Sequence, residues 1–296
     1  MRIALVSRFF PRAYHAGGPV QSLGAMVTAL PDGVDLEIVT SNRDHGESRP
    51  LNVVADTWTD WHGATVLYAS RLRRLLSGLR AASRHSPAFL YVNSLFDPVY
   101  AGLPQLLRAF GYFRRTQIVV APRGELSPGA LALRRTKKRI YLSLYRRLGF
   151  ARSVLWHAST AMEADDIRKT FGTSTRIVIR RNDTSLPDRA FQRTDRVPGP
   201  CRLVFVSRLS EKKRLHLLLQ ALPLVEGDFE LRVVGAFDDP AYERSCRVLI
   251  QSLGMRDKVA FVGPLSRDGV LAELRAADCF VFPTGGGNFG HVIAEG

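Results

Sequence analysis

Short apolar runs alternate with amphipathic segments along most of the chain. Runs rich in Val, Ile, Leu and Phe predict buried strands at residues 1–7, 36–40, 65–68, 89–92, 117–121, 154–157, 176–179, 203–206, 230–234, 259–262 and 279–282. Apolar residues at helical spacing predict helices between them, at 20–30, 71–80, 131–150, 161–171, 215–222, 242–253 and 267–276. This alternation predicts an α/β fold with parallel sheets. The polar residues 42–63, which contain Trp58 and Trp61, are expected to leave the sheet.

The alternation stops once, between Arg180 and Cys201. This stretch has no apolar periodicity and contains Pro187, Pro198 and Pro200, so it is the best candidate for a linker. A chain of 296 residues is also long for a single domain of this class. We therefore predict two domains, residues 1–190 and residues 191–296.

The positive charge is concentrated in the first of these domains. Residues 1–190 contain 28 Lys and Arg against 14 Asp and Glu, whereas residues 191–296 contain 14 against 13. A strongly basic domain indicates an anionic partner. A phospholipid surface, a lipid diphosphate and a nucleic acid all fit the charge alone.

The amino-acid composition indicates the cellular compartment of the protein. Three cysteines without a motif favour a reducing environment and argue against a disulfide framework or a zinc site. The apolar run at the N-terminus is too short for a signal peptide, and no apolar stretch of about 18 residues occurs. We expect a cytoplasmic protein.

The segment 203–222 carries the clearest candidate chemistry. After the apolar run comes a polar loop with Arg208, then Ser210 as a candidate N-cap, and a helix is expected to hold Lys213 in its first turn. Backbone N–H groups at a helix start and two fixed cations suit a diphosphate. An ordinary strand–helix unit with a solvated basic turn fits the same pattern, so both interpretations stay open.

Two loops in the first domain are candidates for the other side of a cleft. Gly17 and Gly18 precede a helix, where they allow either a tight turn or close approach of the backbone to a ligand. Arg123 and Glu125 follow a predicted strand, and ligands of open α/β sheets lie at such strand ends. A salt bridge within the loop explains the second pair equally well.

The segment 131–150 is basic and amphipathic. Its apolar side chains are expected on one face, at Leu133, Ile140, Tyr141, Leu144 and Leu148. Its basic side chains are expected on the other face, at Arg134, Arg135, Lys138, Arg139 and Arg146. Such a helix can lie on an anionic membrane or cover a domain with a solvated outer face.

Several motifs together resemble a known family. They are HAGGPVQSL (15–23), YVNSLFDP (91–98), APRGELSPGAL (121–131), VSRLSEKKRLHLLLQAL (206–222), VAFVGPLSRDGVLAELRAADCFVFPT (259–284) and FPTGGGNFGHVIAEG (282–296). The set is similar to the family 4 retaining glycosyltransferases, and the motifs at 91–98 and 121–131 resemble a subgroup that acts in bacterial polysaccharide assembly. The resemblance implies the GT-B fold, with two Rossmann-like domains, and a nucleoside diphosphate sugar as donor substrate. No carboxylate pair with metal-ligand spacing is evident in the sequence, so we expect no obligatory metal, and no cofactor besides the donor substrate.

The resemblance also implies roles for individual residues. Arg208 and Lys213 match the pair that holds the donor diphosphate, and Glu295 matches the glutamate that takes the ribose hydroxyls. The other matches lie in loops that approach the donor, at Asn288, Phe289 and Gly290 in the second domain and at Gly17 and Gly18 in the acceptor-side first domain. The loop 261–264 is expected beside the nucleobase.

The chain departs from the family pattern at four points. Gly287 replaces the first glutamate of the family's paired-glutamate motif, Arg214 replaces a usual glycine, and Arg123 stands where many relatives have a histidine. The sequence also ends at Gly296, one residue after the motif, from which we expect an incomplete second domain.

The sequence supports three candidate functions. The first is a glycosyltransferase that acts with retention on a membrane-associated saccharide or lipid-linked acceptor, placed in the cytoplasm or peripherally on the inner face of the membrane. The second is a catalytically impaired, nucleotide-sugar-binding fragment of the same scaffold, suggested by Gly287. The third, a nucleic-acid binder, is the least favoured because no RNA- or DNA-binding module pattern occurs.

Overall fold

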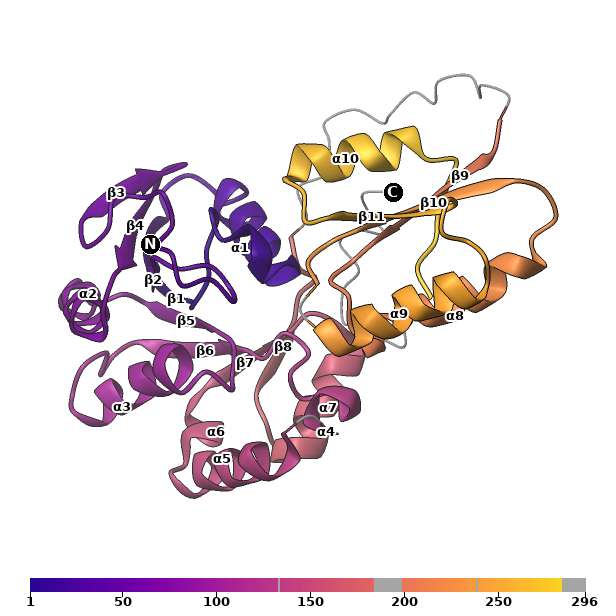
Figure 1. Cartoon of the computed structure of the whole chain (residues 1–296). Helices are drawn as coiled ribbons and strands as arrows, with labels where there is room; N and C mark the ends of the chain where they lie inside the picture. Colours follow the sequence, from indigo (N-terminus) through magenta and orange to yellow (C-terminus); the bar gives the residue numbers. More distant parts are fainter. Residues whose placement is uncertain (133, 184–198, 238, 284–296) are drawn as a thin grey trace. The chain divides into compact units, whose positions relative to one another are not determined.

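The computed structural model describes residues 1–132, 134–183, 199–237 and 239–283 (Figure 1). The chain separates into two compact units, Met1–Ser185 and Leu186–Gly296, which we call the first and second unit. The linker predicted between the domains falls largely on residues 184–198, outside the described residues. Each unit is built around its own sheet of mainly parallel strands.

The first sheet has the strand order β3-β4-β2-β1-β5-β6-β7-β8. Its strands are β1 (Arg2–Val6), β2 (Asp35–Ser41), β3 (Trp58–Trp61), β4 (Ala64–Ala69), β5 (Phe89–Asn93), β6 (Gln117–Ala121), β7 (Leu155–Ala158) and β8 (Ile177–Ile179). All neighbouring pairs are parallel except β3 and β4. The expectation that residues 42–63 leave the sheet is therefore wrong for Trp58–Trp61, which pair antiparallel with Ala64–Ala69 at the sheet edge.

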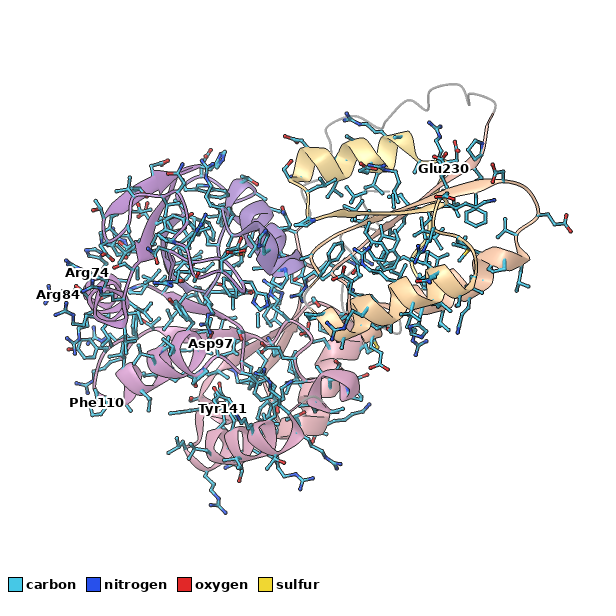
Figure 2. The ribbon with its side chains drawn as sticks, viewed as in Figure 1. Arg74, Arg84, Asp97, Phe110, Tyr141 and Glu230 are labelled. Carbon is cyan, nitrogen blue, oxygen red and sulfur yellow. The ribbon has the colours of Figure 1, made fainter. Side chains whose placement is uncertain are left out.

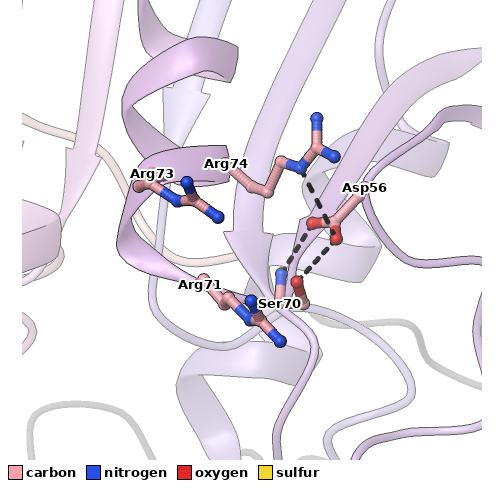
Figure 3. Close-up of a pocket in the computed structure, with 5 residues that line it drawn as sticks. All are labelled: Asp56, Ser70, Arg71, Arg73 and Arg74. Atoms are coloured by element: carbon pink, nitrogen blue, oxygen red, sulfur yellow. Dashed lines mark hydrogen bonds and ion pairs between the residues drawn. The ribbon is translucent and has the colours of Figure 1, made fainter.

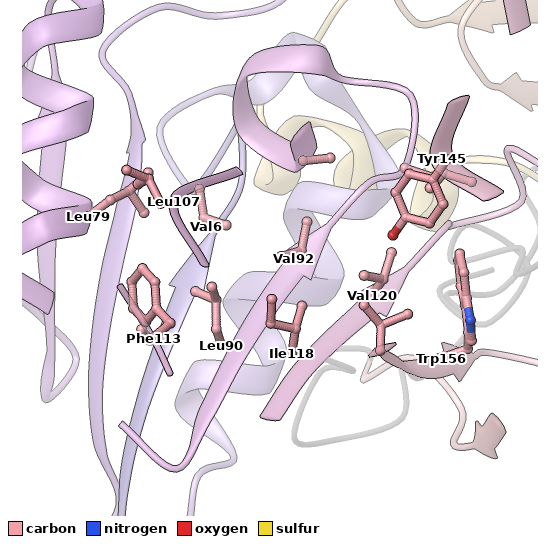
Figure 4. Close-up of a cluster of buried hydrophobic side chains, with 14 of the residues drawn as sticks. Val6, Leu79, Leu90, Val92, Leu107, Phe113, Ile118, Val120, Tyr145 and Trp156 are labelled. Atoms are coloured by element: carbon pink, nitrogen blue, oxygen red, sulfur yellow. The ribbon is translucent and has the colours of Figure 1, made fainter. Parts of the chain in front are cut away.

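The helices of the first unit fall mostly where apolar spacing placed them. They are α1 (Gly18–Thr28), α2 (Leu72–Arg84), α3 (Leu103–Ala109), α4 (Pro128–Ala132), α5 (Arg135–Arg147), α6 (Phe150–Ser153) and α7 (Ala161–Phe171). Between these helices and the sheet lies a core of Val, Leu, Ile and aromatic side chains (Figure 4). Trp156 and Val92 are fully buried there, as the apolar runs at β7 and β5 predicted.

The predicted helix 131–150 consists of separate helices in the structure, and the face of α5 that is buried differs from the predicted one. Arg134 has a left-handed backbone (φ 53°) and is the N-cap residue of α5. On α5 the buried side chains are Leu142 and Tyr145, whereas Ile140 is 64% exposed. Lys138, expected on the solvated face, donates from Nζ to the carbonyl oxygen of Ala130 at 2.6 Å.

The outward face of α5 is consequently part apolar and part basic. Leu144 and Leu148 are exposed with Ile140, one and two helical turns along, and Arg139, Arg146 and other basic residues are exposed beside them. Sequence spacing alone could not decide which of two apolar rows packs inward, because both repeat at three- and four-residue intervals.

The second unit has the strand order β11-β10-β9-β12, all parallel. Its strands are β9 (Cys201–Val206), β10 (Phe229–Val234), β11 (Val259–Gly263) and β12 (Cys279–Phe280), and its α-helices are α8 (Leu215–Ala221), α9 (Pro240–Ser252) and α10 (Arg267–Ala276). Phe205, Leu219 and Val233 are fully buried in its core. No helix in the described part of the chain is long and apolar enough to cross a membrane.

Candidate functional site

A connected set of polar side chains lies at the carboxyl ends of strands β5 to β8 in the first sheet. Because these strands are parallel neighbours, their carboxyl ends meet at one edge, where ligands of open α/β sheets bind. The set consists of Tyr91 and Asn93 at the end of β5, Arg123 and Glu125 after β6, His157 and Ser159 around the end of β7, Glu163 on α7 and Asn182 after β8. The sequence predicted two of its members, Arg123 and Glu125.

Arg123 is the centre of this set. Its Nε donates to Oδ1 of Asn93 at 2.7 Å, one terminal nitrogen donates to the Tyr91 hydroxyl at 2.9 Å, and the other donates to Oδ1 of Asn182. The backbone of Arg123 is left-handed (φ 54°), a conformation that costs a non-glycine residue free energy. These hydrogen bonds hold the guanidinium in one orientation and tie β5 and β6 to the segment after β8.

Tyr91 continues the chain of hydrogen bonds to His157. His157 Nε2 lies 2.8 Å from the carbonyl oxygen of Arg180, so it must carry the proton and donate it. His157 Nδ1 is then an acceptor, and the Tyr91 hydroxyl donates to it at 2.6 Å. Burial lowers the pKa of His157, and the nearby Arg123 charge acts in the same direction. The neutral imidazole is therefore the form that this arrangement requires.

Glu125 does not form the loop salt bridge with Arg123. Its carboxylate accepts hydrogen bonds from the Ser94 hydroxyl at 2.8 Å and from the backbone N–H groups of Leu95 (2.6 Å) and Phe96 (3.2 Å). Burial raises the pKa of Glu125, and these hydrogen bonds oppose the rise. The geometry makes Glu125 a residue that fixes the turn after β5.

Glu163 has the same function on the other side of Arg123. It accepts from the backbone N–H of Gly124 at 2.6 Å and from the backbone N–H (2.7 Å) and hydroxyl (2.6 Å) of Ser159. It is only 2% exposed. The sequence Thr160-x-x-Glu163 is a capping-box signature that could have drawn attention to it, and Thr160 does cap α7 by accepting from the Glu163 N–H.

The predicted glycine pair lies at the start of α1. Gly17 has φ 74° and precedes the first helical residue, Gly18. The turn before α1 therefore requires a backbone conformation at Gly17 that favours glycine. This supports the turn as a reason for glycine at this position. The approach of this loop to a donor phosphate stays a prediction.

In the second unit, Arg208 stands on the loop that follows β9. The loop is held by backbone hydrogen bonds, from Ser207 N–H to the Val234 carbonyl at 2.9 Å and from Leu209 N–H to the Ala236 carbonyl at 2.8 Å. Gly235 lies between these two acceptors with φ 138°, and a Cβ there would be 1.9 Å from the Ser207 carbonyl oxygen. Glycine at position 235 therefore allows the backbone after β10 to pack closely against the loop that carries Arg208.

Lys213 follows five residues later, but not in the first turn of a helix. Residues Glu211–Lys213 form a 3-10 turn, the Ser210 side chain makes no capping hydrogen bond, and α8 begins at Leu215. The Lys213 Nζ lies 4.9 Å from the centre of the Phe282 ring. The prediction of an α-helix that starts at Ser210 is wrong, because Arg214 adopts a left-handed backbone that separates the 3-10 turn from α8.

Arg214 has a left-handed backbone with φ 55°. This conformation explains why the family pattern has a glycine at this position, since glycine adopts it without steric cost. The departure is therefore tolerated at a cost in conformational free energy.

The remaining predicted donor residues, Gly287, Asn288, Phe289, Gly290 and Glu295, lie outside the described residues. Of the segment 261–264 expected beside a nucleobase, Phe261 lies in β11, and the guanidinium of Arg247 on α9 is 4.2 Å from the centre of its ring. No group of three or more metal-binding side chains is present among the residues that the structure describes.

Comparison with solved structures identifies the fold class. Sucrose-phosphate synthase from Thermosynechococcus elongatus has a TM-score of 0.69 at 15% identity, over 98% of this chain and 77% of that one. Anabaena Alr3699/HepE in complex with UDP and glucose has a TM-score of 0.65 at 16% identity, over 99% and 77%. WaaG, a glycosyltransferase involved in lipopolysaccharide biosynthesis, has a TM-score of 0.60 at 16% identity, over 99% and 77%. The fold is α/β with two Rossmann-like units, as in these GT-B glycosyltransferases.

A family model matches the second unit. Residues 188–296 match the family described as glycosyl transferases group 1, which supports the resemblance at that level. Among curated proteins, none matches the chain. The family-matched segment contains both Arg208 and Lys213.

Proposed function

We propose that the protein is a glycosyltransferase that moves a sugar from a nucleoside diphosphate sugar to a saccharide or lipid-linked acceptor, with retention of configuration, in bacterial polysaccharide assembly. One observation carries the proposal: Arg208 and Lys213 follow the same strand, β9, within the family-matched segment. Two cations after one strand suit a diphosphate, which carries negative charge in the donor and gains more as the sugar departs. The UDP bound to Anabaena HepE is in line with such a donor.

The first unit supplies the acceptor side in this proposal. Arg123 is held by Asn93, Tyr91 and Asn182, so its guanidinium has a fixed direction before any substrate binds. Fixed polar groups stabilise a reacting geometry without reorganisation. Glu125 and Glu163 contribute by fixing the loops on either side of Arg123.

An anionic membrane surface is the proposed location of the acceptor. The exposed apolar side chains Ile140, Leu144 and Leu148 on α5 lie among basic residues, the composition of a helix that binds at an anionic lipid interface. Flotation with vesicles containing anionic lipid should recover the protein, and vesicles of neutral lipid should recover far less. Equal recovery of a Leu144→Glu variant would contradict this location.

The direct test of catalysis is Lys213→Ala in the full chain. If Lys213 compensates charge in the transition state, turnover with a panel of nucleoside diphosphate sugars should fall by about two to three orders of magnitude. Lys258→Ala is the matched control, because Lys258 forms an exposed ion pair with Asp228 at 2.6 Å and, like Lys213, lies over an aromatic ring, 5.0 Å from the centre of Phe229. A Lys213→Ala variant with the rate of the control would refute the proposal.

The alternative is a nucleotide-sugar-binding protein without turnover, and Gly287 is the observation that favours it. Calorimetry with nucleoside diphosphates separates the two functions when it is combined with the transfer assay. Diphosphate binding that depends on Lys213, with no sugar transfer from any donor, would establish the alternative.

A further inference from the structure

A hollow of about 280 Å³ lies in the first unit where β4 ends and α2 begins. It is lined by Asp56, Ser70, Arg71, Arg73 and Arg74 (Figure 3). The three arginine side chains leave the start of α2 and extend around the space opposite Asp56 (Figure 3). None of these residues belongs to the sites described above.

The charges that line the hollow do not balance. Asp56 accepts hydrogen bonds from the Ser70 N–H (2.9 Å) and hydroxyl (2.5 Å) and lies 3.8 Å from the Arg74 Nε. These Ser70 hydrogen bonds lower the pKa of Asp56, so the carboxylate is charged at neutral pH. Against this one carboxylate stand three guanidinium groups, so the hollow keeps a surplus of two positive charges.

Arg71 and Arg73 account for this surplus. Among the described residues, neither has a carboxylate within the 4.0 Å of an ion pair. Like charges gathered around one space repel each other, and an oxyanion removes that repulsion. The planar guanidinium also presents paired N–H donors that match the oxygen atoms of phosphate and carboxylate groups.

The hollow shares an edge of the sheet with the Arg123 set. Strands β4, β2, β1, β5 and β6 are parallel neighbours, so Arg71 after β4 and Arg123 after β6 lie at the same carboxyl edge. Four strand spacings of about 4.8 Å separate the two strands, roughly 19 Å in all. Arg8 after β1 and Arg43 after β2 also follow their strands by two residues, and Arg8 is paired with Asp97 at 3.1 Å.

We propose that the arginine hollow binds a phosphate or carboxylate group carried by the acceptor saccharide, away from the group that receives the sugar. This inference rests on the proposed transfer to a saccharide acceptor, and it adds that the acceptor is anionic. The shared chemistry is an oxyanion, supplied either by a phosphorylated acceptor or by a uronic acid residue.

The test measures binding of simple oxyanions and does not depend on sugar transfer. All variants carry Arg208→Ala and Lys213→Ala, so that neither donor-side cation binds the probes, which are inorganic phosphate, glucuronate and, as a neutral control, glucose. The decisive variant is Arg71→Ala with Arg73→Ala. Arg84→Ala is the matched control, because Arg84 is exposed in the last turn of the same helix (Figure 2).

The affinity is compared for whichever of phosphate and glucuronate the parent protein binds more tightly. The double variant should bind this oxyanion at least roughly tenfold more weakly than the Arg84→Ala control, since it loses two charge-assisted contacts. Asp56→Asn should change affinity in the opposite direction, tightening it by about threefold, because a competing negative charge is removed. Asn suits the left-handed backbone at Asp56 (φ 62°), which favours a folded variant.

The preferred probe distinguishes the two sources of the oxyanion. Stronger binding of phosphate indicates a phosphorylated acceptor, and stronger binding of glucuronate indicates a uronic acid. Equal affinity of the double variant and the Arg84→Ala control would overturn the inference, as would a parent protein that binds neither oxyanion. If the double variant loses oxyanion binding while the protein that keeps Arg208 and Lys213 transfers no sugar from any donor, this site stands and the proposed function is rejected.

Discussion

The two units hold the loops at their strand ends in different ways. In the first unit side chains do so, since Arg123, Glu125 and Glu163 each bind several groups from other segments. In the second unit backbone groups fix the loop that carries Arg208, through Ser207 and Leu209. The difference implies that polar side chains hold the strand-end loops of the first unit, whereas backbone hydrogen bonds hold the Arg208 loop of the second.

The three tryptophans of the chain allow the two units to be followed separately. Trp58, Trp61 and Trp156 all lie in the first unit, so their fluorescence reports its unfolding alone. Circular dichroism reports both units. Urea unfolding measured with both signals therefore assigns each effect to a unit.

The largest expected effect comes from Gly235→Ala. The new methyl group would meet the Ser207 carbonyl oxygen, so we expect the second unit to lose about 3 kcal/mol or more. Circular dichroism should show the loss while tryptophan fluorescence stays unchanged. Gly227→Ala is the control, because Gly227 also has a positive φ (101°) but open space around it. Equal losses in the two variants would show that close backbone approach does not hold this loop.

Arg123→Ala should break the first unit's arrangement. It leaves Tyr91, Asn93 and Asn182 without their shared donor, and we expect a loss of about 2–4 kcal/mol in the tryptophan-detected transition. Arg208→Ala should cost less than Arg123→Ala, because the Arg208 side chain is exposed whereas that of Arg123 is half-buried. The contrast between the units fails if both substitutions cost the same.

The stability of the first unit should depend on the protonation of His157. Because the pKa of His157 is lowered in the folded state, its contribution is complete above the unfolded pKa of about 6.5 and is lost as pH falls through the folded value. Arg123 and Arg180 oppose protonation, and Glu163 favours it. His157→Gln should therefore flatten the fall in tryptophan-detected stability below pH 6.5. An unchanged slope in this variant would assign the pH dependence to other groups.

The smallest expected effect is a gain. Arg214→Gly removes the steric cost of the left-handed backbone and should stabilise the second unit by about 0.5–1 kcal/mol. Arg214→Ala loses the same charge but keeps the strained conformation, so it should show no gain. A gain in both variants would point to charge repulsion in the turn instead of backbone strain.

The sequence by itself determined the local elements and the class of the second unit. Apolar periodicity placed β6 and α10 at the bounds that the structure has, because strand and helix patterns repeat within a few residues. The motifs around Arg208 and Lys213 likewise lie in one continuous segment, and that segment matches the glycosyl transferases group 1 family.

Only the tertiary structure decided which distant residues meet. The hydrogen bond between Tyr91 and His157 joins positions 66 residues apart, and that between Arg123 and Asn93 joins positions 30 apart. The same is true of the antiparallel pairing of β3, the inward face of α5 and the delayed start of α8. The pairing of β3 depends on strand order, the inward face of α5 on competition between two apolar rows, and the start of α8 on the left-handed backbone of one residue, Arg214. None of these leaves a repeating pattern in the sequence.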